Sequence, residues 1–112
     1  MRLREMKYTD WGITEQRLCE LLQEARKESN GELLKLATVA SDEYIAPFLQ
    51  VSLMSPARGT GKRLETSRGF KNTYIGDRWN RVYPPCKADD FYAYRRVALF
   101  MFNKLLKMEA LG

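Results

Sequence analysis

Hydrophobic residues recur at helical spacing in the first half of the chain and predict three helices there. The first is predicted over residues 12–31, with Thr14 suited to cap its N-terminus and Asn30-Gly31 suited to end it. Its apolar residues follow the i, i+3, i+4, i+7 spacing of one helix face, and they are Leu18, Leu21, Leu22 and Ala25.

The second and third helices are predicted over residues 30–40 and 41–55. The apolar side of the second is predicted to hold Leu33, Leu36, Ala37 and Ala40. Ser41 is placed to cap the third helix, but Pro47 requires either a kink or a start near Ala46, because a proline ring clashes with the preceding turn and offers no N–H. The buried side of this helix is predicted to be Ile45, Phe48, Leu49 and Leu53.

A longer amphipathic pattern predicts a final helix from Asp90 to Glu109, capped by Asp89 or Asp90. One broad apolar face is predicted to comprise Phe91, Tyr94, Ala98, Met101, Phe102, Leu105 and Met108. The opposite side is predicted to comprise Tyr92, Arg95, Arg96, Leu99 and Asn103. We expect Tyr92 and Leu99 to be exposed on that side.

Residues 56–88 have no helical period and are rich in glycine and basic side chains. A short helix around Leu64 is one interpretation of residues 61–69, and a small β-hairpin turning at Gly76-Asp77 is one interpretation of residues 72–85. The sequence therefore predicts a mainly α-helical single domain over residues 1–112. It has about four helices, with a basic irregular insert at about 56–88 before the long C-terminal helix.

The charge distribution changes this picture, because the excess positive charge lies in one segment. The net charge is +5, yet residues 1–55 carry 7 basic and 9 acidic side chains, whereas residues 56–96 carry 10 basic and 4 acidic ones. Aromatic residues are interleaved with these charges: Phe70, Tyr74, Trp79, Tyr83, Phe91, Tyr92 and Tyr94. Such a segment can hold a phosphate backbone while its rings stack, or it can be a solvated basic surface whose rings enter the core.

The residue types disfavour catalysis and cofactor binding. The chain has no histidine, and its two cysteines, Cys19 and Cys86, are too few for a Cys₄ zinc site, so we expect no metal and free thiols. The G-x-G-K at 59–62 lacks the length of a P-loop, and we expect no cofactor and no enzymatic activity. Lys87 beside Cys86 suggests an activated thiol as the alternative.

No segment of the sequence is predicted to enter a membrane. No apolar run approaches the roughly 18 residues of a membrane span, and the N-terminus lacks the apolar centre of a signal peptide. We therefore expect a cytoplasmic location and no membrane partner.

The stretch DDFYAYRRVALFMFNKLL, residues 89–106, resembles the last helix of sigma-factor region-4-like helix-turn-helix proteins, a group that includes small phage late-transcription regulators. The layout is also similar to short proteins carried by prophages and integrative elements of Gram-positive bacteria. The resemblance implies a regulator that binds double-stranded DNA. It implies that Tyr92, Arg95 and Arg96 lie near base edges or phosphates, and that Lys62, Arg63 and Arg68 contact the backbone.

One departure from the helix-turn-helix pattern leaves a second interpretation open. More than twenty residues separate Glu65 from Asp90, whereas the motif joins its helices by a turn of roughly three or four residues. Either a hairpin has been added to the motif, or the motif is broken. In the second case the chain is a helical protein-interaction module, whose partner is a second copy or a phage protein.

Overall fold

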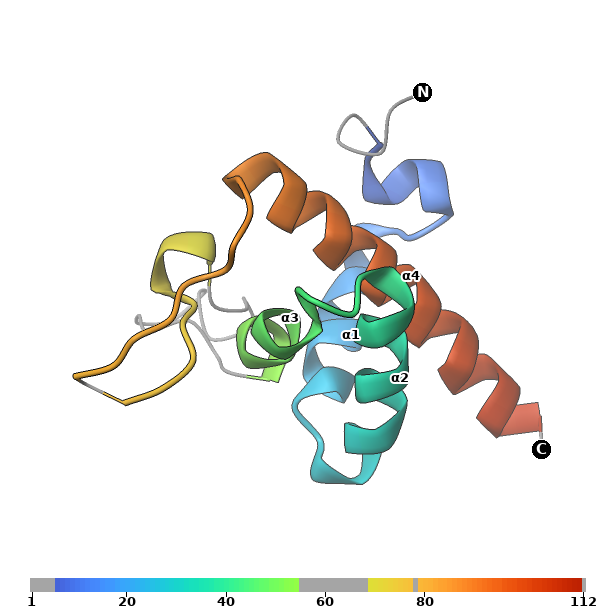
Figure 1. The fold of residues 1–112 in the computed structure, drawn as a ribbon. Coiled ribbons are helices and arrows are strands. Elements are labelled where there is room, and N and C mark those ends of the chain that lie inside the picture. The colour runs from blue at the N-terminus through green and yellow to red at the C-terminus, as the bar shows by residue number, and fades with distance from the viewer. Residues whose placement is uncertain (1–5, 55–68, 78, 112) are drawn as a thin grey trace.

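The computed structural model describes residues 6–54, 69–77 and 79–111. Within these residues the chain forms four α-helices and three 3₁₀ helices (Figure 1). In chain order they are η2 (Tyr8–Trp11), α1 (Glu15–Ala25), η3 (Glu28–Asn30), α2 (Gly31–Ser41), α3 (Ala46–Met54), η5 (Phe70–Asn72) and α4 (Ala88–Leu111). The predicted mainly α-helical fold with a long C-terminal helix is confirmed.

The long helix α4 runs across the molecule, and the other helices pack around it (Figure 1). It packs most extensively on α2 and also contacts α1 and α3. Phe91, Ala98, Leu99 and Phe102 of α4 are completely buried in the shared core. Side chains on several sides of α4 are therefore enclosed, which distinguishes it from a surface helix with one apolar stripe.

Helix α1 begins where the sequence predicts and ends earlier. Thr14 caps it, because the side-chain oxygen accepts the N–H of Arg17 at 3.1 Å. The helix stops at Ala25, and the chain then turns through η3. Asn30 holds this turn by donating its side-chain amide to the carbonyl of Glu24 at 2.9 Å and to the carboxylate of Glu24 at 2.8 Å.

Helix α2 is rotated relative to the prediction by about one residue. Leu36, predicted to be buried, has 58% of its surface exposed. The buried residues are Leu34, Ala37 and Thr38. Ser41 follows at the same helical spacing and donates its hydroxyl to the carbonyl of Tyr94 at 2.6 Å. The face that meets α4 decides which residues are buried, and the period alone does not reveal that face.

Helix α3 begins at Ala46, so Pro47 lies in its first turn, where the missing N–H has no intrahelical acceptor. This confirms one of the two predicted outcomes for the proline. The residue that organises the turn before α3 is Asp42 and not the predicted serine. Its carboxylate accepts the backbone N–H groups of residues 44 and 45 at 2.9 and 3.0 Å.

The described part of the predicted insert contains a short hairpin. Ile75 and Val82 form an antiparallel bridge in which each N–H donates to the other carbonyl at 2.8 Å. This bridge lies where the hairpin was predicted, but the described residues contain no β-strand. The expected short helix at 61–69 falls mostly on residues outside the described ranges.

The prediction that Leu99 and Asn103 lie on an outward side of α4 is wrong. Leu99 is completely buried and Asn103 is 8% exposed, because α1 packs against this side. Asn103 accepts a hydrogen bond from Nε of Arg17 at 2.9 Å, which joins the two helices. Met108 was predicted to be in the core and is 66% exposed, because it lies in the last turn of the helix.

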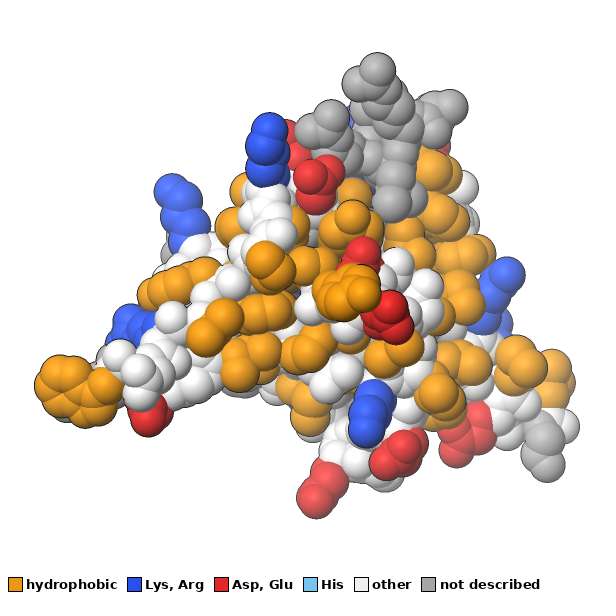
Figure 2. All heavy atoms as spheres, in the orientation of Figure 1, with side chains coloured by type: hydrophobic (Ala, Val, Ile, Leu, Met, Phe, Trp, Pro, Cys, Tyr) orange, Lys and Arg blue, Asp and Glu red, His pale blue; other side chains and the backbone are white. Residues whose placement is uncertain are grey.

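Large apolar side chains lie on the surface of both the helices and the hairpin, as the broad hydrophobic areas of Figure 2 illustrate. The exposed large hydrophobic residues among those described are Leu36, Val39, Tyr44, Met54, Trp79, Val82, Tyr83, Met108 and Leu111. None of the described helices is long and apolar enough to span a membrane.

Candidate phosphate-binding site

A concave pocket of about 380 Å³ lies between η2, α1 and the N-terminal half of α4. Its lining residues are Tyr8, Leu18, Leu22, Gly69, Tyr92, Arg95 and Arg96. Two of these seven are arginines and none is acidic, so the described wall of the pocket is positively charged.

Helical periodicity explains why the arginines face this pocket. Tyr92, Arg96, Leu99 and Asn103 follow one another at i, i+4, i+7 and i+11, and the lower two residues are buried against α1. The upper two therefore also point toward the α1 side of α4. Arg95 flanks this row and completes the pair of cations.

Arg95 is the most constrained charged group of the pocket. Its Nε is buried and has no hydrogen-bond partner. Burial lowers the pKa of the Arg95 guanidinium, and the nearby charge of Arg96 adds to this lowering, while Tyr8 and Tyr92 oppose it. An arginine stays protonated at neutral pH. The pocket therefore holds a desolvated positive charge, and no described carboxylate is among the groups that shift its pKa.

Tyr92 shapes the pocket through both its ring and its hydroxyl. The hydroxyl accepts the backbone N–H of Phe70 at 3.0 Å, which attaches the start of η5 to α4. The ring lies edge-on to Phe91 at a centroid distance of 5.6 Å, and the guanidinium of Arg95 lies 5.9 Å from its centre. Tyr92 is half-buried, so the expectation that it projects freely into solvent is wrong.

Tyr8 forms the side of the pocket that comes from the N-terminal segment. Burial raises the pKa of the Tyr8 hydroxyl, and the positive charges of Arg95 and Arg96 partly offset this. The segment is fixed by a hydrogen bond from the N–H of Lys7 to the carboxylate of Asp10 at 2.7 Å. A neutral phenol beside two cations is a hydrogen-bond donor for an anionic ligand.

Gly69 closes the pocket where the chain approaches α4. A β-carbon at this position would lie 3.2 Å from the hydroxyl of Tyr92, so a larger residue would press on the tyrosine. Glycine therefore permits the close approach through which Tyr92 receives the N–H of the next residue, Phe70.

The structure brings together three of the six predicted site residues, Tyr92, Arg95 and Arg96. The other three, Lys62, Arg63 and Arg68, lie outside the described residues. The sequence interpretation missed Tyr8 and Gly69, which are far from α4 in the chain. It assigned Leu18 and Leu22 only to the core.

The remaining reactive side chains show no arrangement for chemistry in the part of the chain that is described. Burial raises the pKa of the Cys86 thiol, and the charges of Asp90 and Asp42 raise it further. This corrects the idea that Lys87 activates the thiol. No group of three or more His, Cys, Asp or Glu among the described residues is placed to hold a metal ion.

Comparisons with known proteins add no relative to this description. No family model matches the chain, and no curated protein or solved structure matches it. The spacing of the described helices also bears on the helix-turn-helix resemblance. Helix α3 ends at Met54 and α4 begins at Ala88, so these two helices are not joined by a short turn.

Proposed function

We propose that this chain binds nucleic acid and that the pocket beside α4 holds a phosphate of the backbone. The observation that carries the proposal is the pair Arg95 and Arg96 in a concave wall with no acidic lining residue. Guanidinium groups bind phosphate oxygens through paired N–H donors. Because Nε of Arg95 is buried, its terminal nitrogens are the groups that can reach a ligand in the pocket.

An anion offsets the electrostatic cost of burying Arg95. Burial is the main cause that disfavours the charge of Arg95, and the nearby charge of Arg96 adds to it. A phosphate beside Arg95 stabilises this buried charge and can also accept the hydroxyl protons of Tyr8 and Tyr92. The hydroxyl of Tyr92 already accepts one N–H, so its own proton is available for a ligand.

A polymeric phosphate is favoured over a free one by the charge of the whole segment. Residues 56–96 carry ten basic and four acidic side chains, and Gly69, Tyr92, Arg95 and Arg96 of the pocket belong to this segment. Contacts of basic residues with successive phosphates release counterions and strengthen binding at low salt. The role of a regulator of phage or mobile-element type, acting on double-stranded DNA, rests on the resemblance of residues 89–106.

The proposal is tested by fluorescence anisotropy with a labelled duplex of random sequence at about 50 and 200 mM salt. The variant Arg95→Met/Arg96→Met removes the two pocket charges. The control Lys35→Met/Lys107→Met removes the same charge from exposed positions on α2 and on the last turns of α4.

We expect the pocket variant to lose about tenfold or more in affinity, and the control to lose much less. If both arginines hold one phosphate, the slope of log K against log salt should become less negative by about 0.9 in the pocket variant. Equal losses in the two double variants would mean that net charge governs binding and that the pocket has no special role. No duplex binding at the lower salt would contradict the proposal as a whole.

A second function, that of a helical interaction module, is favoured by one observation. Leu36 and Val39 of α2, and Met108 and Leu111 of α4, are large apolar residues that are between 46% and 89% exposed. Light scattering at tens of micromolar tests this function through self-association. A strict monomer whose mass is unchanged by Leu36→Glu would argue against a homo-oligomer.

A further inference from the structure

The hairpin between η5 and α4 is attached to the helical body at its root. The side chain of Thr73 is completely buried, and its hydroxyl donates to the carbonyl of Gly69 at 2.7 Å. The ring of Phe70 packs edge-on against Phe91 of α4 at 5.3 Å. The loop then extends away from the helices, as Figure 1 shows on the side opposite the C-terminus.

The turn of the hairpin has a defined geometry. Gly76 has φ of +99°, and a β-carbon there would lie 2.0 Å from the carbonyl oxygen of Asn80, so the turn requires glycine. The carboxylate of Asp77 accepts the N–H groups of Trp79 at 2.8 Å and Asn80 at 2.9 Å. This carboxylate is therefore engaged with backbone donors inside the turn.

The turn presents a tryptophan that is 84% exposed. An indole is the largest apolar side chain, and leaving it in water is unfavourable by about 25 cal/mol for each Å² of apolar surface. The same ring is a frequent anchor in binding surfaces because it offers a wide flat face. The hydrogen bonds of Asp77 and the exposure of Trp79 together indicate a contact surface.

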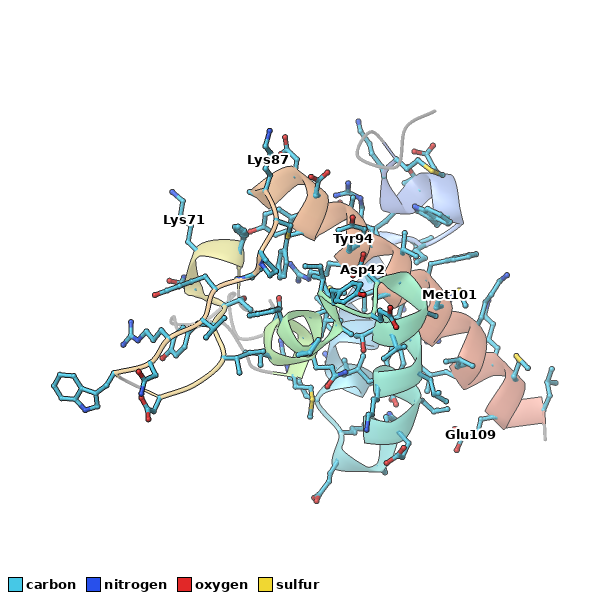
Figure 3. All side chains as sticks on the ribbon, viewed as in Figure 1. Asp42, Lys71, Lys87, Tyr94, Met101 and Glu109 are labelled. Atoms are coloured by element: carbon cyan, nitrogen blue, oxygen red, sulfur yellow. The ribbon has the colours of Figure 1, made fainter. Side chains whose placement is uncertain are left out.

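Arg81, Lys71 and Lys87 are exposed basic side chains on the loop and at its two ends. The guanidinium of Arg81 lies 4.6 Å from the ring centre of Tyr74, and the rings of Tyr74 and Tyr83 are 5.9 Å apart. A hydrogen bond to Tyr83 is the main cause that raises the pKa of Arg81, and an arginine is protonated at neutral pH in any case. Lys71 and Lys87 project into solvent near the two ends of the loop (Figure 3).

We propose that this hairpin is a second nucleic-acid contact, in which Trp79 stacks on an exposed base while Arg81 pairs with a neighbouring phosphate. The inference rests on the proposed function and adds a substrate preference to it. Bases within a duplex already cover each other, and separating them costs a few kcal/mol per step. Bases of a single strand are free to stack on an aromatic ring. The hairpin therefore favours single-stranded nucleic acid or a duplex with unpaired bases.

The fluorescence of Trp79 provides a direct readout. Trp11→Phe leaves Trp79 as the only tryptophan, and the substitution keeps an aromatic ring against Phe100, 4.6 Å away. Titration with an oligothymidylate of about 12 nucleotides should quench the emission of this variant, because stacking places a base on the indole. The same addition should leave the emission unchanged in a variant that retains only Trp11, Trp79→Ala.

Affinity measurements separate the hairpin from the pocket. Trp79→Ala should bind the oligothymidylate about tenfold more weakly and should bind a fully paired duplex about as well as the unaltered protein. The control Tyr44→Ala removes another aromatic residue, 77% exposed but outside the hairpin, and should bind both ligands normally. Thermal unfolding checks that each variant keeps its fold.

Two results would overturn the inference. The first is that Trp79→Ala binds the oligothymidylate as well as the unaltered protein does, and that the emission of Trp11→Phe does not change when the oligothymidylate is added. The second is that a polyglutamate peptide quenches the emission of Trp11→Phe and the oligothymidylate does not. The second result would point to an acidic protein partner. Neither result decides the role of the pocket, because Arg95→Met/Arg96→Met is assayed separately on the duplex.

Discussion

Replacement of Arg95 by methionine should stabilise the protein while it weakens binding to nucleic acid. The arginine places a buried Nε–H without a partner at the edge of the core, beside a second cation. Methionine retains the aliphatic length of the side chain and removes the charge and the unpaired donor. The variant therefore separates the effect of Arg95 on stability from its effect on binding.

The magnitude follows from two opposing effects. A buried donor without an acceptor costs about 1–3 kcal/mol, and because Arg95 is partly exposed we take about 1.5 kcal/mol from the lower half of that range. The contact with the ring of Tyr92, at 5.9 Å, is lost and contributes about 0.5 kcal/mol in an exposed setting. The net gain is about 1 kcal/mol, which corresponds to a rise of about 4 °C in Tm for a chain of this length.

Urea and thermal unfolding, followed by circular dichroism without ligand, measure this effect. Arg95→Lys is the matched control, since it keeps the positive charge and should not give the same gain. A loss of about 1 kcal/mol or more in Arg95→Met would refute the reasoning. It would mean that the guanidinium contributes stabilising contacts in the free protein and that the site is not held ready for an anion.

Three further substitutions or reactions test the local structure. Gly76→Ala should destabilise the protein more than Gly12→Ala does, as measured by urea unfolding. Both glycines have positive φ, but only at Gly76 would an added β-carbon clash, with the carbonyl oxygen of Asn80. Equal losses of stability in the two variants would contradict the turn geometry. The hydrogen bond from Lys27 is the main cause that lowers the pKa of Glu24. A lowered carboxyl pKa stabilises the fold above the unfolded value and loses that effect as the pH falls through the folded value. Glu24→Gln should therefore be less stable by about 0.5 kcal/mol at pH 7, and the difference should begin to shrink only as the pH falls below about 4.5; a pH-independent difference would argue against it. Cys86 should react with iodoacetamide more slowly at pH 8 than a free thiol does, since burial raises its pKa; faster reaction, measured by mass spectrometry, would contradict this environment.

The sequence predicts the presence of a helix, and the residue at which it begins, where these depend on interactions between residues close in the chain. The cap at Thr14 depends on the chain's own next residues, and the start of α3 depends on the missing N–H of Pro47. Both are visible in a short window of sequence. The bridge between Ile75 and Val82 was also accessible, because the turn residues between them are specific.

The orientation of each helix was harder to predict, because it depends on distant neighbours. Leu36 fits an apolar stripe by period, yet the face one residue away meets α4. The sequence pattern places Leu99 on an outer side of the last helix, whereas in the structure α1 covers that side. A helix that is covered on two sides has no polar face from which its orientation can be read.

Some residues of the candidate pocket could be predicted from the sequence and others could not. Arg95 and Arg96 stand out by composition, so the cationic part was accessible from the sequence. Tyr8 and Gly69 reach the pocket only through the tertiary fold, and their local sequence carries no sign of the contact. The burial of Arg95, which supports the phosphate proposal, is likewise a property of the packing of α4 against its neighbours.

The most direct measurement is the side-chain ¹⁵N–¹H NMR signal of the Arg95 Nε–H during titration with duplex DNA. The signal is identified by its absence in Arg95→Met, and its burial should keep exchange with water slow. The account predicts that this signal and that of Arg96 shift as the duplex is added, and shift back when salt is raised to about 200 mM. Binding that moves other signals and leaves the Arg95 signal unchanged would contradict the claim that this pocket holds a phosphate.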